Sequence, residues 1–165
     1  MWGWNGWRRY RAEPVARRRL LWEALIALWR ARLALAFIPF KRLAARLGTL
    51  GGESVDQISP AEELAAQDIG WAVGTMAPRV PWDSRCLAQA IAAYRMLEKR
   101  GLDATVYFGV KQSSEQPFSA HAWLRCGACF VTGGAGHLDY KVLTQFSRMA
   151  TAALDSGSSR EDVIA

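Results

Sequence analysis

Hydrophobic and polar residues follow two different periods, which divide the chain into a helical N-terminal half and a C-terminal half of strands. Apolar residues at helical spacing predict a helix over about residues 16–37, ending near Pro39, and a short one over 41–47. Residues 59–62 (SPAE) form a capping box with proline at the first helical position. They predict a third helix that runs to about Met76.

A cysteine stands at the start of the next predicted helix, in the stretch PWDSRCLAQAIAAYRML at 81–97. Ser84 is of a type that favours the N-cap position, and Gly101 suits the left-handed residue after a helix. Cys86 then lies in the first turn, where unpaired backbone N–H groups and the positive dipole end favour a thiolate. The alternative is a small buried hydrophobic residue, as most free cysteines are.

After Gly101 the hydrophobic pattern changes to a period of two. It predicts strands over 104–110, 118–126 and 129–132, with a tight connection between the last two. Residues 140–146 fit either one more short strand or the start of a helix. Helices followed by an antiparallel sheet place the chain in the α+β class.

At 165 residues the chain has the size of one compact domain. We divide it into a basic helical segment that ends in a linker (1–58, with the linker at 48–58), a core (59–150) and a C-terminal tail (151–165). The tail is rich in Ser, Gly and charged residues, and we expect it to be flexible.

The positive charge is concentrated at the N-terminus. Residues 1–50 hold eleven Arg or Lys against two Glu (+9), whereas the rest holds ten basic against thirteen acidic residues (−3). Such a segment can bind nucleic acid or anionic lipid, or dock partner proteins or an acidic peptide. We favour a helix that covers the core with one face and exposes solvated arginines on the other, and we expect no nucleic acid. A membrane surface is not favoured.

The cysteine content and the charge pattern bear on the compartment. Three cysteines, two of them three residues apart, do not make a disulfide framework and fit a reducing cytoplasm. The apolar segment at 20–40 is interrupted by Glu23, Arg30 and Arg32, so we expect no membrane span, and we see no signal peptide.

The chain has two histidines, His121 and His137. His121 lies in the strand segment SAHAWL, where a histidine is by default a structural residue. However, a cysteine at a helix start, followed by a histidine on a strand, is a common arrangement of Cys–His nucleophilic sites. His137 is the rival base, but its Gly-rich loop (GGAGH) positions a side chain less firmly.

Several segments together resemble a known family: SRCLAQAIAAYRMLEKRGLDATVYFGV, then FSAHAWLRCGACFVTGG and DYKVLTQF. They are similar to the transglutaminase-like cysteine peptidases of lasso peptide biosynthesis, the leader peptidase subunits, over roughly residues 20–147. The S-x-C-L before an Ala-rich helix and the A-H-A-W on a strand are the specific parts. The resemblance implies a transglutaminase- or papain-like core with a cysteine-bearing helix on an antiparallel sheet, Cys86 as nucleophile and His121 as general base.

The third member of a triad is where this chain departs from that family, which often has an Asp on the strand after the His strand. A hairpin about Gly127 places Thr132 or Gly133 opposite His121, and neither is acidic. Asp139 is the nearest downstream carboxylate, and we predict that it orients His121. Thr132 or a backbone carbonyl remains the alternative.

Cys126 and Cys129 form a CxxC motif, which raises the question of zinc. A four-ligand zinc site needs partners beyond one CxxC, and only His137 would be left to supply one. We therefore expect no metal and no cofactor, with both cysteines filling space at the hairpin.

The resulting hypothesis is a cysteine endopeptidase that cuts the leader from a ribosomally made lasso precursor peptide. The resemblance implies two protein partners: a small leader-recognition protein and an asparagine-synthetase-like cyclase. Two alternatives are an acyl transferase of the same fold, which passes the thioester to an amine, and a non-catalytic scaffold in which the basic helix anchors an assembly.

Overall fold

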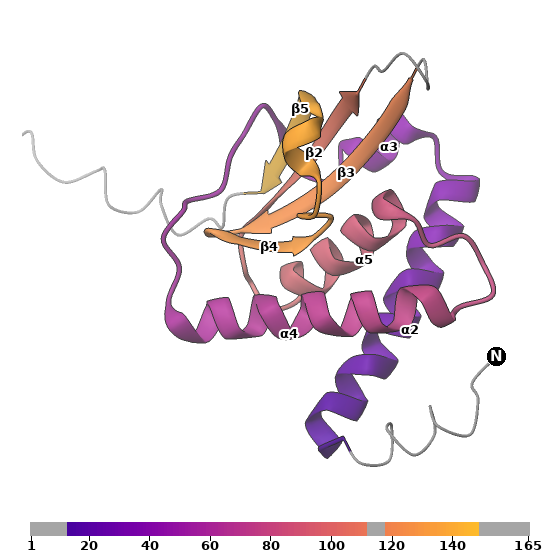
Figure 1. Ribbon diagram of the computed structural model, residues 1–165, viewed down its shortest axis with the longest axis vertical. Coiled ribbons are helices and arrows are strands. Elements are labelled where there is room, and N and C mark those ends of the chain that lie inside the picture. Colours follow the sequence, from indigo (N-terminus) through magenta and orange to yellow (C-terminus); the bar gives the residue numbers. More distant parts are fainter. Residues whose placement is uncertain (1–12, 112–117, 149–165) are drawn as a thin grey trace, which may run out of the picture.

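The computed structural model describes residues 13–111 and 118–148 (Figure 1). Its helices are α2 (Val15–Phe37), α3 (Phe40–Ala44), α4 (Pro60–Met76) and α5 (Cys86–Glu98), with short 3-10 turns η1 (Ala77–Arg79) and η2 (His137–Asp139). Its strands are β1 (Thr49–Leu50), β2 (Ala104–Lys111), β3 (Ser119–Cys126), β4 (Cys129–Thr132) and β5 (Lys141–Arg148). The segment left open between strand and helix at 140–146 is thus a strand.

The strands form one antiparallel sheet in the order β1-β5-β2-β3-β4. Helix α5 lies against β2, β3 and β4, and α2 and α4 pack around it on the same side of the sheet (Figure 1). The α+β class predicted from the sequence is confirmed. Within the described residues, no helix has the length and apolar character needed to cross a membrane.

The start of α4 agrees with its local sequence signal, whereas the N-cap of α5 differs from the predicted one. The Ser59 hydroxyl accepts the Glu62 N–H at 3.3 Å, and the Glu62 carboxylate accepts the Ser59 N–H at 2.7 Å, so the capping box of α4 is formed. The prediction of Ser84 as N-cap of α5 was wrong. Arg85 holds that position without a side-chain cap, and the Ser84 hydroxyl donates to the Ala77 carbonyl at 2.6 Å.

The core lies between the sheet and the helices. Alanines make up much of the buried face of α5, which allows this helix to approach the strands closely. Large side chains from the other elements fill the remaining space, among them Leu28, Ile69 and Leu124. The buried Tyr94 hydroxyl donates to the Leu47 carbonyl at 2.8 Å, which fixes the chain after α3 against α5.

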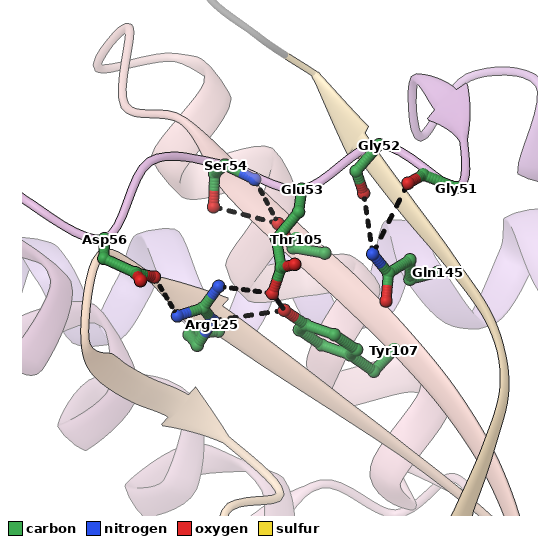
Figure 2. A network of polar contacts seen from close by, with 9 residues as sticks. All are labelled: Gly51, Gly52, Glu53, Ser54, Asp56, Thr105, Tyr107, Arg125 and Gln145. Carbon is green, nitrogen blue, oxygen red and sulfur yellow. Dashed lines mark hydrogen bonds and ion pairs between the residues drawn. The ribbon is translucent and has the colours of Figure 1, made fainter.

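The segment predicted as a linker is bound to the sheet. Figure 2 shows residues 51–56, here called the strap, crossing β5, β2 and β3. The buried Ser54 donates its N–H to the Thr105 hydroxyl at 2.8 Å, and Arg125 contacts both Glu53, at 2.6 Å, and Asp56. Thr105 and Arg125 alternate with core residues of their strands, so the strap covers the sheet face opposite α5.

Two segments of the sequence cannot be compared with the structure. The predicted flexible tail, 151–165, and the first twelve residues of the basic segment, 1–12, lie outside the described residues.

Candidate active site

Cys86 is the first residue of α5, and its free thiol is partly exposed. The loop before it is tied down at two points: Asp83 accepts the Arg85 N–H at 3.2 Å, and Gln89 donates from within the helix to the Ser84 carbonyl at 2.7 Å. The first N–H groups of a helix have no intrahelical acceptor. The thiol therefore stands beside backbone donors that can hold a negative charge.

His121 lies on β3, and its Nε2 is 2.8 Å from the Gly133 carbonyl oxygen. Because a carbonyl oxygen can only accept a hydrogen bond, Nε2 carries the proton and donates it. In the neutral ring, Nδ1 is then the nitrogen that can accept a proton from a nucleophile. This tautomer follows from the hydrogen bond and leaves Nδ1 as the basic atom.

Aromatic rings hold the His121 imidazole in place. The Tyr140 ring lies 5.0 Å and the Trp123 ring 5.9 Å from it, centroid to centroid. Gly109 is the β2 residue paired with His121, and a Cβ there would come within 2.8 Å of Trp123 and 2.9 Å of Tyr140. A glycine is thus required opposite the histidine for these rings to approach one another.

Cys86 and His121 both line one pocket of about 410 Å³. The two residues are far apart in the sequence, and the packing of α5 on the sheet brings them to the same opening. Apolar residues from four elements make up much of its wall: Leu35 of α2, Leu87 of α5, Phe108 of β2, and Ala120 and Ala122 of β3.

Charged groups lie at the side of the pocket where α5 begins. Arg85 holds Asp83 through two guanidinium nitrogens, at 2.8 to 3.1 Å. These hydrogen bonds are the largest cause of a lowered pKa of Asp83, and the charge of Arg32 on α2 lowers it further. Arg32 also lines the pocket, so two arginines face one carboxylate there.

The predicted orienting carboxylate, Asp139, forms an ion pair with a lysine. Asp139 is in η2, with its side chain 61 % exposed and its carboxylate 3.0 Å from Lys111 Nζ. Thr132 is buried, and its hydroxyl has no hydrogen-bond partner within the described residues. Of the alternatives left open by the sequence, the backbone carbonyl, that of Gly133, is the one bonded to His121. The role of Asp139 stays a prediction.

His137, the rival base, is positioned by its own loop. Its Nδ1 donates to the Gly134 carbonyl at 2.6 Å, and its ring lies 4.3 Å from Phe130. Among the described residues, those lining the pocket of Cys86 do not include His137.

Cys126 and Cys129 face each other across the β3–β4 turn as register partners. Burial raises the pKa of the Cys126 thiol to about 11, and it also raises the pKa of Cys129. Both shifts disfavour the thiolate form that metal ligation requires. In the described parts of the chain, no group of three or more His, Cys, Asp and Glu side chains gathers as a metal site would require.

Sequence reasoning missed the contribution of α2 to the pocket. Arg32 and Leu35 come from a helix that the sequence suggested only as a cover for the core. A backbone carbonyl was one of the alternatives, and Gly133 was one of two residues expected opposite His121, but residue type does not show which main-chain carbonyl accepts from the ring. Gly109, a glycine within a strand, did carry a signal of close approach by other groups.

Comparison with known proteins gives one match. No curated protein and no solved structure matches the chain significantly. A family description, the Transglutaminase-like superfamily, matches residues 27–145, which include α5, most of the sheet and the part of α2 from Ala27 onward. That match covers well over half of the chain and contains both Cys86 and His121, and the chain therefore belongs to the transglutaminase-like superfamily.

Proposed function

We propose that the chain is a cysteine endopeptidase that removes the leader from a lasso precursor peptide in the cytoplasm. The superfamily generally includes cysteine peptidases and transglutaminases, so a cysteine protease or acyl transferase type of activity is the broader statement. The observation that carries the proposal is the shared pocket of Cys86, at a helix start, and His121. The S-x-C-L and A-H-A-W motifs support the lasso assignment.

In the proposed mechanism, His121 Nδ1 takes the thiol proton and the Cys86 sulfur attacks the scissile carbonyl. Backbone N–H groups at the start of α5 stabilise the oxyanion of the tetrahedral intermediate. The imidazolium then returns its proton to the leaving amine, and a thioester remains on Cys86. Water, deprotonated by His121, hydrolyses the thioester and frees the thiol.

The Gly133 carbonyl supports these steps by holding Nε2–H and fixing the ring tautomer. A carbonyl is a dipole rather than a full negative charge, so it stabilises the imidazolium less than a carboxylate does. The imidazolium is therefore expected to be a transient species in this site.

The resemblance supplies the proposed partners. A small leader-recognition protein delivers the precursor, and an asparagine-synthetase-like cyclase takes the product.

The test is Cys86→Ala, with Cys129→Ala as the matched control because Cys129 lies at the hairpin turn. Each variant is incubated with the precursor and the partners, and the products are followed by mass. We expect Cys86→Ala to stay folded by circular dichroism and to abolish leader removal, while Cys129→Ala cleaves like the unaltered protein. Continued cleavage by Cys86→Ala would end the cysteine-peptidase proposal.

Two further readouts address the alternatives. Addition of a primary amine during cleavage separates hydrolysis from acyl transfer, because a transferase forms an amide product. A thiol probe that labels Cys86 selectively, and less in His121→Ala, argues against a purely structural scaffold.

A further inference from the structure

Helix α2 is apolar on two opposite sides. Its core side buries Leu21, Ala24, Leu28 and Ala31. Large apolar side chains also lie on its outer side, in a set here called the α2 stripe: Ile26, Trp29, Leu33 and Phe37, which are 51 %, 50 %, 37 % and 81 % exposed. The outer face was expected to carry solvated arginines, and it carries this stripe beside them.

The spacing of the stripe makes it one continuous surface. Its members follow one another at intervals of three, four and four residues, which aligns them along one side of a helix. Single exposed apolar residues are ordinary, but an aligned row of large ones marks a surface that another molecule covers.

A groove runs beside the stripe, between α2, α3 and α5, with a volume of about 490 Å³. Ile26 belongs to both the stripe and the groove wall. Small or apolar side chains form the floor, among them Ala31, Leu43 and Met96. The groove can therefore accept apolar side chains from a molecule that lies on the stripe.

The rim of the groove is positively charged. Arg30, Arg46, Arg95 and Lys99 line it with one acid, Glu98. Glu98 is already engaged, since its carboxylate oxygens lie 2.6 Å from Arg95 and 2.6 Å from Arg148. Arg30 and Arg46 are exposed and form no ion pair within the described residues.

We propose that the groove and the α2 stripe dock an acidic amphipathic helix of a partner protein. Apolar side chains on one face of that helix enter the groove and cover the stripe, as in other helix-in-groove complexes. Its Asp and Glu residues meet Arg30 and Arg46, which gives the charge complementarity that selects this partner. A lipid surface is flat and would leave the groove floor unfilled.

The groove and the pocket of Cys86 lie on different sides of the same helix, α2. Arg30 and Ala34 line the groove, while Arg32 and Leu35 of the same helix line the pocket. A partner in the groove is thus about one helix diameter, ~10 Å, from the pocket. The docking proposal does not depend on whether Cys86 is a nucleophile. The further idea that the docked partner brings substrate to the pocket on the other side of α2 rests on the proposed function.

The experiment uses the full chain and a fluorescein-labelled synthetic helix with Leu at helical spacing and Glu elsewhere. A second peptide has Lys in place of every Glu. Binding is followed by fluorescence anisotropy at low and at high salt. We expect the Glu peptide to bind, more weakly as salt rises, and the Lys peptide not to bind.

Two double variants with the same change in net charge locate the site. Arg30→Glu with Arg46→Glu should weaken binding of the Glu peptide by about tenfold or more. Arg79→Glu with Lys141→Glu, both exposed and outside the groove, should leave it within about twofold. Thermal unfolding and thiol titration of Cys86 check that each variant is folded.

Three results would overturn the proposal. The first is equal weakening by both double variants, which means bulk charge only. The second is equal binding of the Lys peptide. The third is no binding of the Glu peptide, including the case in which vesicles of phosphatidylcholine and phosphatidylglycerol bind instead. Failure of leader removal in Cys86→Ala is a separate measurement and affects none of these.

Discussion

At the scale of single residues, the geometry around His121 distinguishes the roles of its two ring nitrogens. Nε2 is bound to a main-chain carbonyl, and the ring faces are flanked by Trp123 and Tyr140. Each of these contacts limits rotation of the imidazole. A general base needs this restraint because the rate of proton transfer falls steeply when the donor and acceptor are misaligned.

The first residue-scale prediction concerns Asp139. Asp139→Asn separates two roles: if Asp139 only forms its surface ion pair with Lys111, kcat/KM should change by no more than about threefold. Lys111→Gln, which removes the other partner, should behave alike. A loss of several orders of magnitude in Asp139→Asn alone would instead make Asp139 the orienting residue.

The second concerns Gly109, which faces His121 on the neighbouring strand. In Gly109→Ala, the new methyl group comes within 2.9 Å of both aromatic neighbours, so the rings beside His121 must shift. We expect a loss of about 1–3 kcal/mol in the free energy of unfolding and a fall in kcat larger than the change in KM.

Gly74→Ala is the control for this substitution. A Cβ at Gly74 on α4 meets nothing within 4 Å, and alanine there should raise helix stability by about 0.5–1 kcal/mol. Chemical unfolding and steady-state kinetics measure both variants. Unchanged kcat in Gly109→Ala would mean that the ring packing does not position His121.

At the scale of elements, the sequence predicts what local chemistry determines. The capping box at Ser59 locates the start of α4, and the Gly101 signal locates the end of α5, where the Gly101 and Leu102 N–H groups bond back to the helix. Ser84 shows the limit of such reasoning. As an N-cap its hydroxyl would have accepted a helix N–H, but packing places it where it donates to the Ala77 carbonyl of the preceding turn.

The strap shows a second limit. Its Gly-, Ser- and Asp-containing sequence indicates irregular structure, but its partners lie on strands more than fifty residues away. Nothing local encodes those contacts. The same reason explains why the apolar stripe on the outside of α2 was not expected: periodicity gives the faces of a helix but not which of them is covered.

The element-scale prediction separates the arginines at the start of α2. Arg17 lies 4.7 Å above the Trp71 ring and 3.9 Å from Asp68, both on α4. Arg17→Glu should therefore lower the free energy of unfolding by about 1 kcal/mol, whereas Arg19→Glu, exposed on the same helix, should change it little. Chemical denaturation compares the two, and equal effects would contradict a packing role for Arg17.

The difference between Arg17 and Arg19 affects how a role of the basic segment in assembly is tested. We predict that reversing Arg17, Arg18 and Arg19 together to Glu weakens the salt-dependent association with the precursor and its recognition protein. That stays a prediction, but Arg17 also holds α2 to α4. The cleaner test of recognition reverses Arg18 and Arg19 alone and measures association at two ionic strengths.

At the scale of the whole molecule, ion pairs join elements that the core brings near one another. Glu98 at the end of α5 contacts Arg95 on the same helix and Arg148 on β5, and Glu23 on α2 contacts Arg100 just after α5. These carboxylates are largely covered, with side-chain exposures of 23 % and 27 %. They tie the N-terminal helix and the last strand to α5.

The consequence is a defined dependence of stability on pH. Partial burial alone would raise the pKa of Glu98, but hydrogen bonds and charges from Arg95 and Arg148 outweigh it and lower the pKa. The hydrogen bond from Arg100 is the largest cause of the lowered pKa of Glu23. A carboxyl whose pKa is lower in the folded state contributes stability above its unfolded pKa of about 4.3, and this is lost as pH falls through the folded value.

Glu98→Gln tests this arrangement. At neutral pH the variant should be less stable than the unaltered protein by about 1 kcal/mol, because Arg95 and Arg148 lose their charged partner. The difference should shrink as pH falls below about 4, where the native carboxyl is protonated as well. Glu63→Gln, exposed in the first turn of α4, should lose only the few tenths of a kcal/mol (~0.3) that a surface carboxylate gains at a helix N-terminus. Urea unfolding of the three proteins from neutral to acidic pH measures the difference, and a gap between Glu98→Gln and the unaltered protein that stays constant across this range would show that Glu98 acts through packing, not through its charge.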